Sequence, residues 1–323
     1  MTSLNVCAAV GSFAVLLVEP RAAVDDADPT FDSSSERYPF LYETMRARRP
    51  VRASRMIYGT RSRWANRVVK KSYVPRGAIG FQPGPAELDL WLPRINGATE
   101  STNVFYLNEA APPLFDMMLY RDDRVFYYRC CQVAAAVFHA RASDGDDEDE
   151  ILNMQLNIIA REEDLTKQAS WPGTLPAVTT GEDYIPYVFS QGLFSLDSTE
   201  YPFDDFKLII DNGLRPKTRN SLTPTCVYAG QRIVKMEINN PFTAASWTKA
   251  QELYTDTDVI GQVRFETGSG GSDEAIQWDF NGLRADLETP TAKGHDEIPL
   301  SLMFDVLCNG TTSSREVVTT NIS

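Results

Sequence analysis

Three segments of this chain alternate apolar and polar residues, and this alternation limits the fold more than any other feature of the sequence. A period of two residues is typical of a β-strand with one buried face and one face in water. The clearest segment is 152–158, and 234–238 and 298–306 follow the same pattern. Further strands are predicted at 114–121 and 124–138, around a charged RDDR turn, and at 262–266 and 275–280, around GSGGSD. The sequence therefore predicts a mainly β protein.

Two segments are predicted to be helices. Residues 85–95 begin with Pro85, which suits a first helical turn, and Pro93 is expected to end or kink the helix. Residues 243–254 can be capped by Thr243. We interpret the apolar stripe of each helix as a core-packing surface, formed in the first by Leu88, Trp91, Leu92 and Ile95, and in the second by Trp247, Ala250, Leu253 and Tyr254.

The predicted elements follow one another in the same order twice. Each half has a basic arm, a short alternating strand, a proline, a helix, a hairpin, an acidic loop and a long alternating strand, with about 150 residues between matching elements. We interpret this order as a tandem duplication. The turn-rich stretch 163–186 is the predicted join, which gives domains at 1–165 and 166–323. A length of 323 residues also favours two domains over one.

The charge of the chain is unevenly distributed. With 31 Lys and Arg against 44 Asp and Glu, the formal net charge is −13, which argues against an overall nucleic-acid binder. Between residues 44 and 76, however, the sequence has eleven basic residues and no acidic one. A milder acid-free stretch, 212–236, carries five more basic residues. One molecule thus combines cationic segments with a strongly acidic body.

The cysteines and the N-terminus indicate neither a disulfide framework nor a membrane anchor. The five cysteines include one vicinal pair and have no CxxC spacing, which favours a reducing compartment. The apolar run at 6–18 has no positive charge before it and is too short to span a bilayer. We expect it to be a buried first strand, and we expect no membrane anchor.

The sequence offers little for catalysis or cofactor binding. His139 and His295 are the only histidines, so no triad or His-rich metal site can be built from them. The glycine cluster at 267–274 lacks a phosphate-binding lysine and is better explained as a hairpin turn. We expect no enzyme activity, no cofactor and no metal.

An acidic loop, DGDDEDE at 144–150, could attract a divalent cation, but it lacks the EF-hand register, and such runs are usually solvated loops. We regard it as a loop that faces a lumen or a docking partner. Its candidate residues are Asp144, Asp146, Asp147, Glu148, Asp149 and Glu150.

The two basic arms are the strongest candidates for functional residues. Tryptophan and tyrosine among the arginines of the first arm would suit nucleic-acid contacts. The alternative is electrostatic docking onto the acidic surface of another copy, and the acidic body favours this second interpretation. In the second arm, IDNGLRPKTRNSLTPT (210–225) is expected to be a strand exit followed by a reaching loop. The candidate interface residues are Arg61, Arg63, Arg67, Lys70, Lys71 and Arg76 in the first arm, and Arg215, Lys217 and Arg219 in the second.

Longer motifs resemble those of the tail tube proteins of bacteriophages with long non-contractile tails. In the second half the matching stretches are YIPYVFSQGLFSLDSTEYPFDDFKLIIDNGLRP and SLTPTCVYAGQRIVKMEI. In the first half they are YPFLYETM (38–45) and YGTRSRWANRVVKKSYVPRGAIGFQPGPAELDLWLPRING (58–97). The dense cation run at 44–76 and the acidic loop depart from the family at large.

The resemblance implies a fold and a function. Each domain would be a β-sandwich or half-barrel with a flanking α-helix and long loops. Three duplicated chains would then form a pseudo-hexameric ring, and stacked rings would form the tube that conducts DNA during ejection. The implied partners are further copies of the chain and the tape-measure, tail-terminator and tail-tip proteins. DNA would pass without specific binding, through a lumen that we expect to be acidic. The implied location is the virion tail, after assembly in the host cytoplasm.

Two alternatives remain open at this point. One is a related ring-forming component, such as a tail terminator, a distal-tail protein or a secretion-tube protein. The other is a DNA-binding module that uses the basic segment 44–76.

Overall fold

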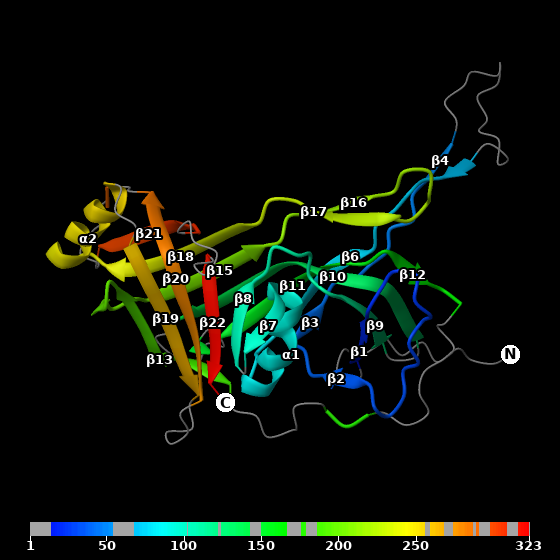
Figure 1. Cartoon of the computed structure of the whole chain (residues 1–323), viewed down its shortest axis with the longest axis horizontal. Coiled ribbons are helices and arrows are strands. Elements are labelled where there is room, and N and C mark those ends of the chain that lie inside the picture. The colour runs from blue at the N-terminus through cyan, green and yellow to red at the C-terminus, as the bar shows by residue number, and fades with distance from the viewer. Residues whose placement is uncertain are drawn as a thin grey trace, which may run out of the picture.

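The protein is mainly β, with long antiparallel strands and two helices in the part of the chain that the structure describes (Figure 1). The computed structural model describes residues 14–53, 68–101, 103–121, 124–142, 150–166, 176–178, 186–255, 259–267, 274–286, 289–290, 298–308 and 316–322. The predicted fold class, mainly β with a helix in each half, is confirmed.

The first half of the chain contains twelve strands and one helix within the described residues. These are β1 (Val15–Arg21), β2 (Glu36–Tyr38), β3 (Tyr42–Glu43), β4 (Val51–Ala53), β5 (Val68–Lys70), β6 (Arg76–Phe81), α1 (Pro85–Asn96), β7 (Gly97–Ser101), β8 (Val104–Leu107), β9 (Leu114–Arg121), β10 (Arg124–Arg141), β11 (Asn153–Ile159) and β12 (Glu162–Asp164).

The second half contributes ten strands and one helix to the same description. These are β13 (Tyr187–Leu196), β14 (Thr199–Glu200), β15 (Asp205–Asp211), β16 (Leu214–Lys217), β17 (Cys226–Ala229), β18 (Ile233–Pro241), α2 (Ala244–Tyr254), β19 (Val259–Thr267), β20 (Ala275–Asp286), β21 (Pro299–Val306) and β22 (Val317–Ile322).

The strands predicted from alternation are present. The segment 152–158 falls largely in β11, and those at 234–238 and 298–306 fall in β18 and β21. Both predicted hairpins are also found, with β10 and β20 longer than expected. The predicted first strand at 6–18 is only partly testable, because residues 1–13 lie outside the described ones, while β1 begins at Val15. The join at 163–186 also lies mostly outside them.

Both helices begin where the sequence predicts. Thr243 accepts a hydrogen bond from the backbone N–H of Ser246 at the start of α2. In α1, Pro85 occupies the first turn. Of the two outcomes expected at Pro93, an end or a kink, the helix end is not found there. The helix continues to Asn96 and ends at Gly97, whose left-handed backbone (φ 98°) lets its N–H bond to the carbonyl of Pro93. Proline lacks an N–H but still accepts through its carbonyl, so the helix can run past it.

The apolar stripes pack as predicted, with one exception. All four stripe residues of α1 are fully buried, as are Ala250 and Leu253 of α2. Trp247 is partly buried and packs against the same core. Tyr254, however, is 67% exposed, so its assignment to the core is wrong. It is the last residue of α2, where the helix turns away from the sheet into the Thr255 cap.

The strand pairings occur twice in the same order. In the first half β1 pairs with β2 and β9, β10 pairs with β9, β11 and β12, and β6 pairs with β3 and β11. In the second half β13 pairs with β14 and β19, β20 pairs with β19, β21 and β22, and β18 pairs with β15 and β21. Each half also has a separate two-stranded hairpin, β4–β5 or β16–β17. Only β7 and β8 lack a counterpart among the described strands.

The registers agree at several points. The shift between Val133 and Ala135 in β10–β11 has no counterpart among the described pairs of β20–β21, and the shift between Val188 and Leu193 in β13–β19 has none in β1–β9. The third residue before each helix cap is Phe81 or Asn240, and these pair with Met154 in β11 and Leu300 in β21. In the β9–β10 hairpin the register shifts between Tyr128 and Cys131 of β10. In the β19–β20 hairpin it shifts between Val259 and Gly261 of β19, which pair with Leu283 and Phe280 of β20. The shared bulge means that both hairpins bend at equivalent points.

A short identical sequence marks the same alignment. Tyr38-Pro39-Phe40 and Tyr201-Pro202-Phe203 precede the strands β3 and β15 at equal distances. Five residues beyond each tyrosine, Glu43 pairs with Ile79 and Phe206 pairs with Ile238. Ile79 and Ile238 each lie five residues before a helix cap. Pairings in several strands therefore give the same residue-by-residue alignment of the two halves.

The two halves form one continuous sheet system. The C-terminal part of β10 pairs with β15 from Ala135↔Asp211 to Arg141↔Asp205, and β22 pairs with β8. An isolated bridge between Ile151 and Val188 completes a closed circuit, β11-β10-β15-β18-β21-β20-β19-β13. The division into domains at 1–165 and 166–323 stays a prediction, since strands of both halves are hydrogen-bonded to each other.

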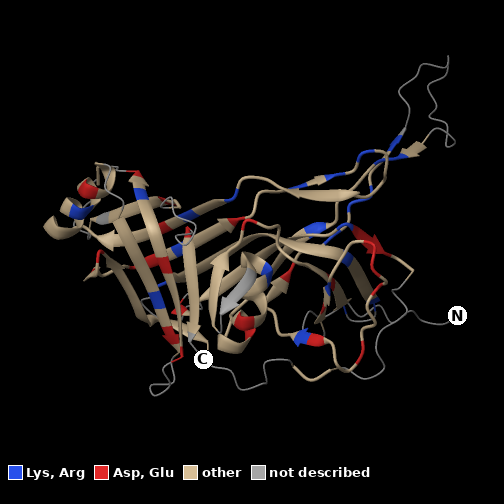
Figure 2. Ribbon diagram, viewed as in Figure 1, with Lys and Arg blue, Asp and Glu red and all other residues tan. Residues whose placement is uncertain are grey.

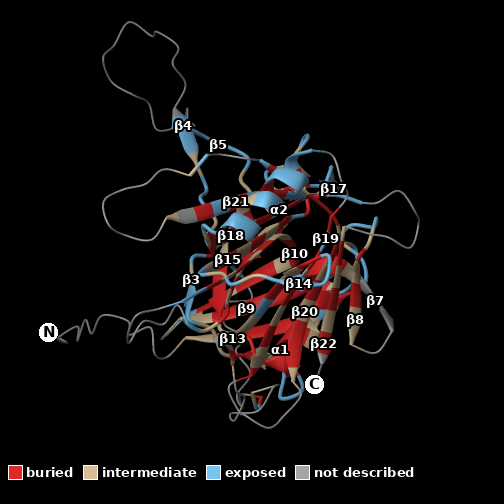
Figure 3. Ribbon diagram, turned by 90° about the vertical axis from the view of Figure 1, so that its left-hand side faces the viewer, coloured by how far each residue is buried: buried red, intermediate tan, exposed pale blue. Residues whose placement is uncertain are grey.

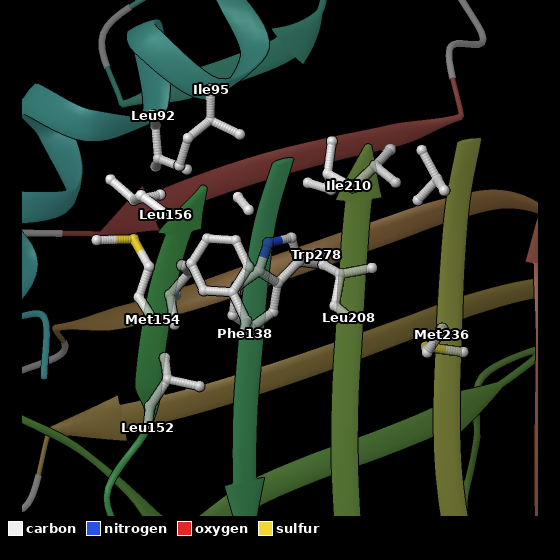
Figure 4. Close-up of a cluster of buried hydrophobic side chains, with 14 of the residues drawn as sticks. Leu92, Ile95, Phe138, Leu152, Met154, Leu156, Leu208, Ile210, Met236 and Trp278 are labelled. Carbon is white, nitrogen blue, oxygen red and sulfur yellow. The ribbon is translucent and has the colours of Figure 1, made fainter. Parts of the chain in front are cut away.

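The core lies between two layers of strands that cross each other. Strands β11, β10, β15 and β18 form one layer, and the strands behind them run across it (Figure 4). Phe138 of β10 packs against Trp278 of β20, which also contacts Phe206 of β15. Crossed layers of this kind bury both inner faces in a single core. Leu92 and Ile95 of α1 cover one end of it (Figure 4).

Candidate assembly surface

Two hairpins project from the body, one from each half, and they are the two basic arms expected from the sequence. The hairpin β16–β17 leaves the second half directly after β15 and runs over the first half, while β4–β5 extends away from the body (Figure 1). Figure 2 shows lysine and arginine along both hairpins.

The base of the second arm is fixed by Asn212 and Gly213. The buried side-chain amide of Asn212 donates to the carbonyls of Ile95 and Val133, both at 3.1 Å. Gly213 has φ 62°, and a Cβ there would come within 2.3 Å of the carbonyl oxygen of Gln231. Only glycine fits this left-handed position without strain. Asn212 and Gly213 therefore start a long hairpin and do not close a tight one, as expected from the sequence.

The tip of the second arm is held against the first half. The backbone N–H of Tyr73 donates to the carbonyl of Leu222 at 2.8 Å. The guanidinium of Arg161 donates through Nε to the carbonyl of Pro224 at 3.0 Å. Both acceptors are backbone carbonyls, which every residue has, so the contact depends on where the backbone of the arm runs and not on its side chains. An arm of one half thus docks on the other half within the chain.

The candidate cations of the second arm are arranged on this docked hairpin. Arg215 and Lys217 lie on β16 and are exposed. Arg219 adopts φ 38° and donates to the hydroxyl of Tyr228. Their charged groups face solvent along the arm, where a second molecule can reach them.

The candidate cations of the first arm are only partly described. Arg61, Arg63 and Arg67 lie outside the described residues. Lys70 and Lys71 are exposed at the end of β5, and Arg76 is exposed at the start of β6, where it pairs with Arg46. Lys70 and Lys71 therefore lie on or directly after the projecting hairpin, whereas Arg76 lies in the main sheet, paired with Ile159 of β11.

The first arm also exposes apolar side chains. Val51 is 65% exposed, Val69 60% and Val68 47%. Figure 3 shows the described part of the β4–β5 hairpin in the colour of exposed residues. Adjacent exposed valines on a two-stranded hairpin are costly in water and are typical of an interaction surface. Sequence reasoning emphasised the charge of this arm and missed its apolar part. Val51, Val68 and Val69, which stand among the arginines and lysines, were the available signal.

Most of the acidic loop lies outside the described residues. This applies to Asp144, Asp146, Asp147, Glu148 and Asp149. Glu150 is described and exposed, and it borders a hollow of about 630 Å³ lined mainly by Phe189, Leu193, Tyr201 and Phe203. Its role in a lumen or in docking stays a prediction.

The outer face of the sheet that joins the halves carries paired charges. Lys207 lies 3.0 Å from Glu237, Lys235 lies 3.6 Å from Asp305, and His139 lies 3.2 Å from Asp205. His139 lies at the β10–β15 junction, where it pairs with Lys207. This polar face extends over strands of both halves.

A buried ionic cluster near β9 was not predicted. The guanidinium of Arg21 lies 2.7 Å from the carboxylate of Asp116, and both side chains are buried. The same carboxylate accepts hydrogen bonds from the backbone N–H of Cys130 at 2.7 Å and from the hydroxyl of Tyr127. Burial raises the pKa of Tyr127, so this hydroxyl remains a donor. The only sequence signal was a single aspartate in the apolar strand LFDMML.

The described residues contain no group of three or more His, Cys, Asp or Glu side chains that could hold a metal ion. Neither described helix combines the length and the apolar character needed to cross a bilayer. The four cysteines that are described, Cys130, Cys131, Cys226 and Cys308, are free thiols.

These features describe a mainly β protein in which two projecting hairpins carry exposed cationic and apolar side chains. A family model described as phage tail tube protein matches residues 14–306, which is most of the chain. The chain therefore belongs to the phage tail tube protein family and is a structural component of a phage tail. No curated protein matches it.

Proposed function

We propose that this chain is the repeating subunit of a tail tube and contributes two tandem tube domains, 1–165 and 166–323, to each ring. The observation that carries the proposal is the second occurrence of the strand pairings, with the same bulge in the β9–β10 and β19–β20 hairpins. A chain with two equivalent domains can complete a six-domain ring with three copies, so the ring is a trimer with pseudo-hexameric symmetry.

The polar outer face of the joined sheet is the surface that suits the channel. It is continuous over β6, β11, β10, β15, β18 and β21, and its lysines Lys207 and Lys235 are paired with carboxylates. DNA binding depends on unpaired cations that replace counterions at the phosphates. Lysines that are paired with carboxylates, on a chain of net charge −13, favour the passage of DNA without binding.

The basic arms contact other copies in this assembly. Exposed cations next to exposed valines suit an interface with the acidic body of a neighbouring subunit. The candidate interface residues Arg61, Arg63, Arg67, Lys70, Lys71, Arg76, Arg215, Lys217 and Arg219 belong to this contact. Rings stack through such arms, and the tape-measure, tail-terminator and tail-tip proteins meet the finished tube. Assembly takes place in the host cytoplasm, and the product is part of the virion.

Electron microscopy of the purified protein tests this proposal. We expect long, uniform tubes with threefold symmetry in each ring. Isolated rings that never stack would favour a terminator, a distal-tail protein or a secretion-tube component. A monomer at all concentrations would overturn the proposal.

The DNA-binding alternative is tested separately by a mobility-shift assay with duplex and single-stranded DNA at low salt. We expect no shift. A salt-sensitive shift that disappears when Lys70 and Lys71 are replaced by Gln would favour a nucleic-acid module.

A further inference from the structure

We propose that neighbouring copies join through an equivalent of the β10–β15 junction between chains: the residues that follow β3 in one copy, at Arg48, meet the end of β20 in the next, at Asp286. The inference rests on the proposed self-assembly and names the surfaces that carry it. Within the chain, the second half docks on the first through this junction. Because the halves share one alignment, the first half presents the same docking edge, and the second half presents the same receiving edge.

The docking edge of the first half is β3 and the residues after it. Tyr42 and Glu43 pair with Gly80 and Ile79, and they occupy the positions of Asp205 and Phe206 in β15. In β15 the other side of the strand is taken by β10, and Phe206 is fully buried.

The corresponding edge of β3 is open to water by comparison. Leu41 is 51% exposed and Tyr42 is 43% exposed. Large apolar side chains beside an edge strand favour pairing with another strand.

The receiving edge of the second half is the end of β20. Asp286 pairs with Met303 in β21, just as Ala135 of β10 pairs with Asn157 in β11. Ala135 takes Asp211 of β15 on its other side. Asp286 is therefore the position at which the junction between copies begins.

The alignment also gives the register of this junction. Asp211 lies ten residues beyond Tyr201, and Arg48 lies ten residues beyond Tyr38. Arg48 of one copy thus faces Asp286 of the next, and both are exposed in the single chain. The two side chains carry opposite charges where the junction within the chain has Asp211 opposite Ala135. Opposite charges at an interface fix register and partner more than they add affinity.

The first arm is expected to dock on the next copy as the second arm docks on the first half of its own chain. The second arm docks beside Arg161, and the position equivalent to Arg161 in the second half is Leu307, which is 46% exposed. Ile233, in the neighbouring strand β18, is 50% exposed. The exposed valines of β4–β5 meet this apolar surface on the next copy. The contact is head-to-tail, and such contacts close into rings when the rotation between copies allows it.

A charge swap tests the register. We expect Arg48→Asp and Asp286→Arg, each alone, to raise the concentration needed for assembly by at least tenfold, because like charges then face each other. The double variant R48D/D286R restores the attraction and should assemble within about twofold of the original protein. Each single variant must remain a folded monomer by circular dichroism, since both residues are exposed.

A disulfide cross-link tests the proximity of positions 48 and 286 independently. The variant R48C/D286C should form covalent oligomers on mild oxidation, ending at the closed ring. The matched control A47C/D286C, one residue out of register, should not. Both are made in a background in which Cys7, Cys226 and Cys308 are replaced by Ser.

The outcomes separate this inference from the proposed function. Normal assembly of both single charge variants, or equal cross-linking of the control pair, overturns the junction while leaving the tube intact. If the original protein does not assemble under any condition, the tube proposal itself fails. Restoration by the double variant, together with cross-linking in register only, supports the junction.

Discussion

The ring of Phe138 in β10 lies 5.1 Å from the indole of Trp278 in β20, with an angle of 59° between the two planes. The two residues belong to different halves of the chain and are both fully buried. Their contact is part of a single core cluster that contains residues of β1 as well as β22. The halves therefore share one hydrophobic interior, although their strand pairings repeat.

Replacing Phe138 by Ala tests this shared core. The change removes contacts with both Trp278 and the β15 side of the core, and it should lower the free energy of unfolding by about 3–5 kcal/mol. Because the core is shared, urea unfolding should remain a single transition when followed by tryptophan fluorescence and by circular dichroism. Phe242→Ala is the control: Phe242 is 39% exposed, and its loss should cost about 1 kcal/mol or less. Two separate transitions would show that the halves unfold independently.

The Arg21–Asp116 pair supports a second prediction. Asp116→Asn removes the nearer of the two carboxylates beside the buried guanidinium of Arg21 and leaves only Asp28, at 3.3 Å, so we expect a loss of about 2–3 kcal/mol in the free energy of unfolding. Replacing both residues together, with Arg21→Met and Asp116→Leu, removes the buried positive charge as well and should cost less than Asp116→Asn alone. Denaturant titration of the three proteins measures the difference. If Asp116→Asn changes stability by under about 1 kcal/mol, the cluster does not have the stabilising role assigned to it.

The second arm can be tested by reversing its charge. Arg215, Lys217 and Arg219 replaced together by Glu should leave a folded protein, because all three side chains point to solvent. Tube growth, followed by light scattering and microscopy, should be impaired. The Gln version of the same triple variant removes the charge without reversing it and should give an intermediate effect. Normal tubes from the Glu variant would exclude a docking role for these residues.

Cys226 offers a chemical probe of the same arm. A hydrogen bond with Tyr228 is the main cause that lowers the pKa of the Cys226 thiol, and Thr225 contributes in the same direction. Burial instead raises the pKa of Cys130 and Cys131. The thiolate is the reactive form, so Cys226 should react with iodoacetamide at neutral pH while the buried pair does not.

The reaction of Cys226 should also report assembly. In a Cys308→Ser background, mass spectrometry of the digested protein gives the labelling rate at each remaining thiol. A slower rate for Cys226 in tubes than in the monomer is expected if the arm is covered by a neighbouring copy. Equal rates in both states would place this side of the arm outside the interface.

Much of the local structure follows from short-range patterns. The alternation at 152–158 predicted β11 because a strand directs successive side chains to opposite faces. Thr243 and Pro85 marked the starts of both helices, since each suits the first turn for its own local reason. The run of apolar residues in α1 correctly gave its buried face. Tyr254 was assigned wrongly because the stripe alone does not show where a helix leaves the core.

The assembly surface was only partly predictable. The absence of acidic residues between 44 and 76 identified the first arm, and the strand exit at Asn212-Gly213 identified the second. The contacts of Leu222 with Tyr73 and of Pro224 with Arg161 could not be foreseen, because backbone carbonyls leave no trace in the pattern of side chains. The burial of Asp116 was hidden for a related reason: its partner Arg21 lies far away in the sequence.

The sequence by itself determined the strand period, the two helices, the acid-free arms and the recurrence of elements in the same order. These properties depend on residues close together in the chain. Only the tertiary structure decided that β10 pairs with β15 and that Phe138 meets Trp278, which places both halves around one core. Such pairings depend on which apolar faces meet across long separations, and the free energy gained by burying them together is a property of the whole fold.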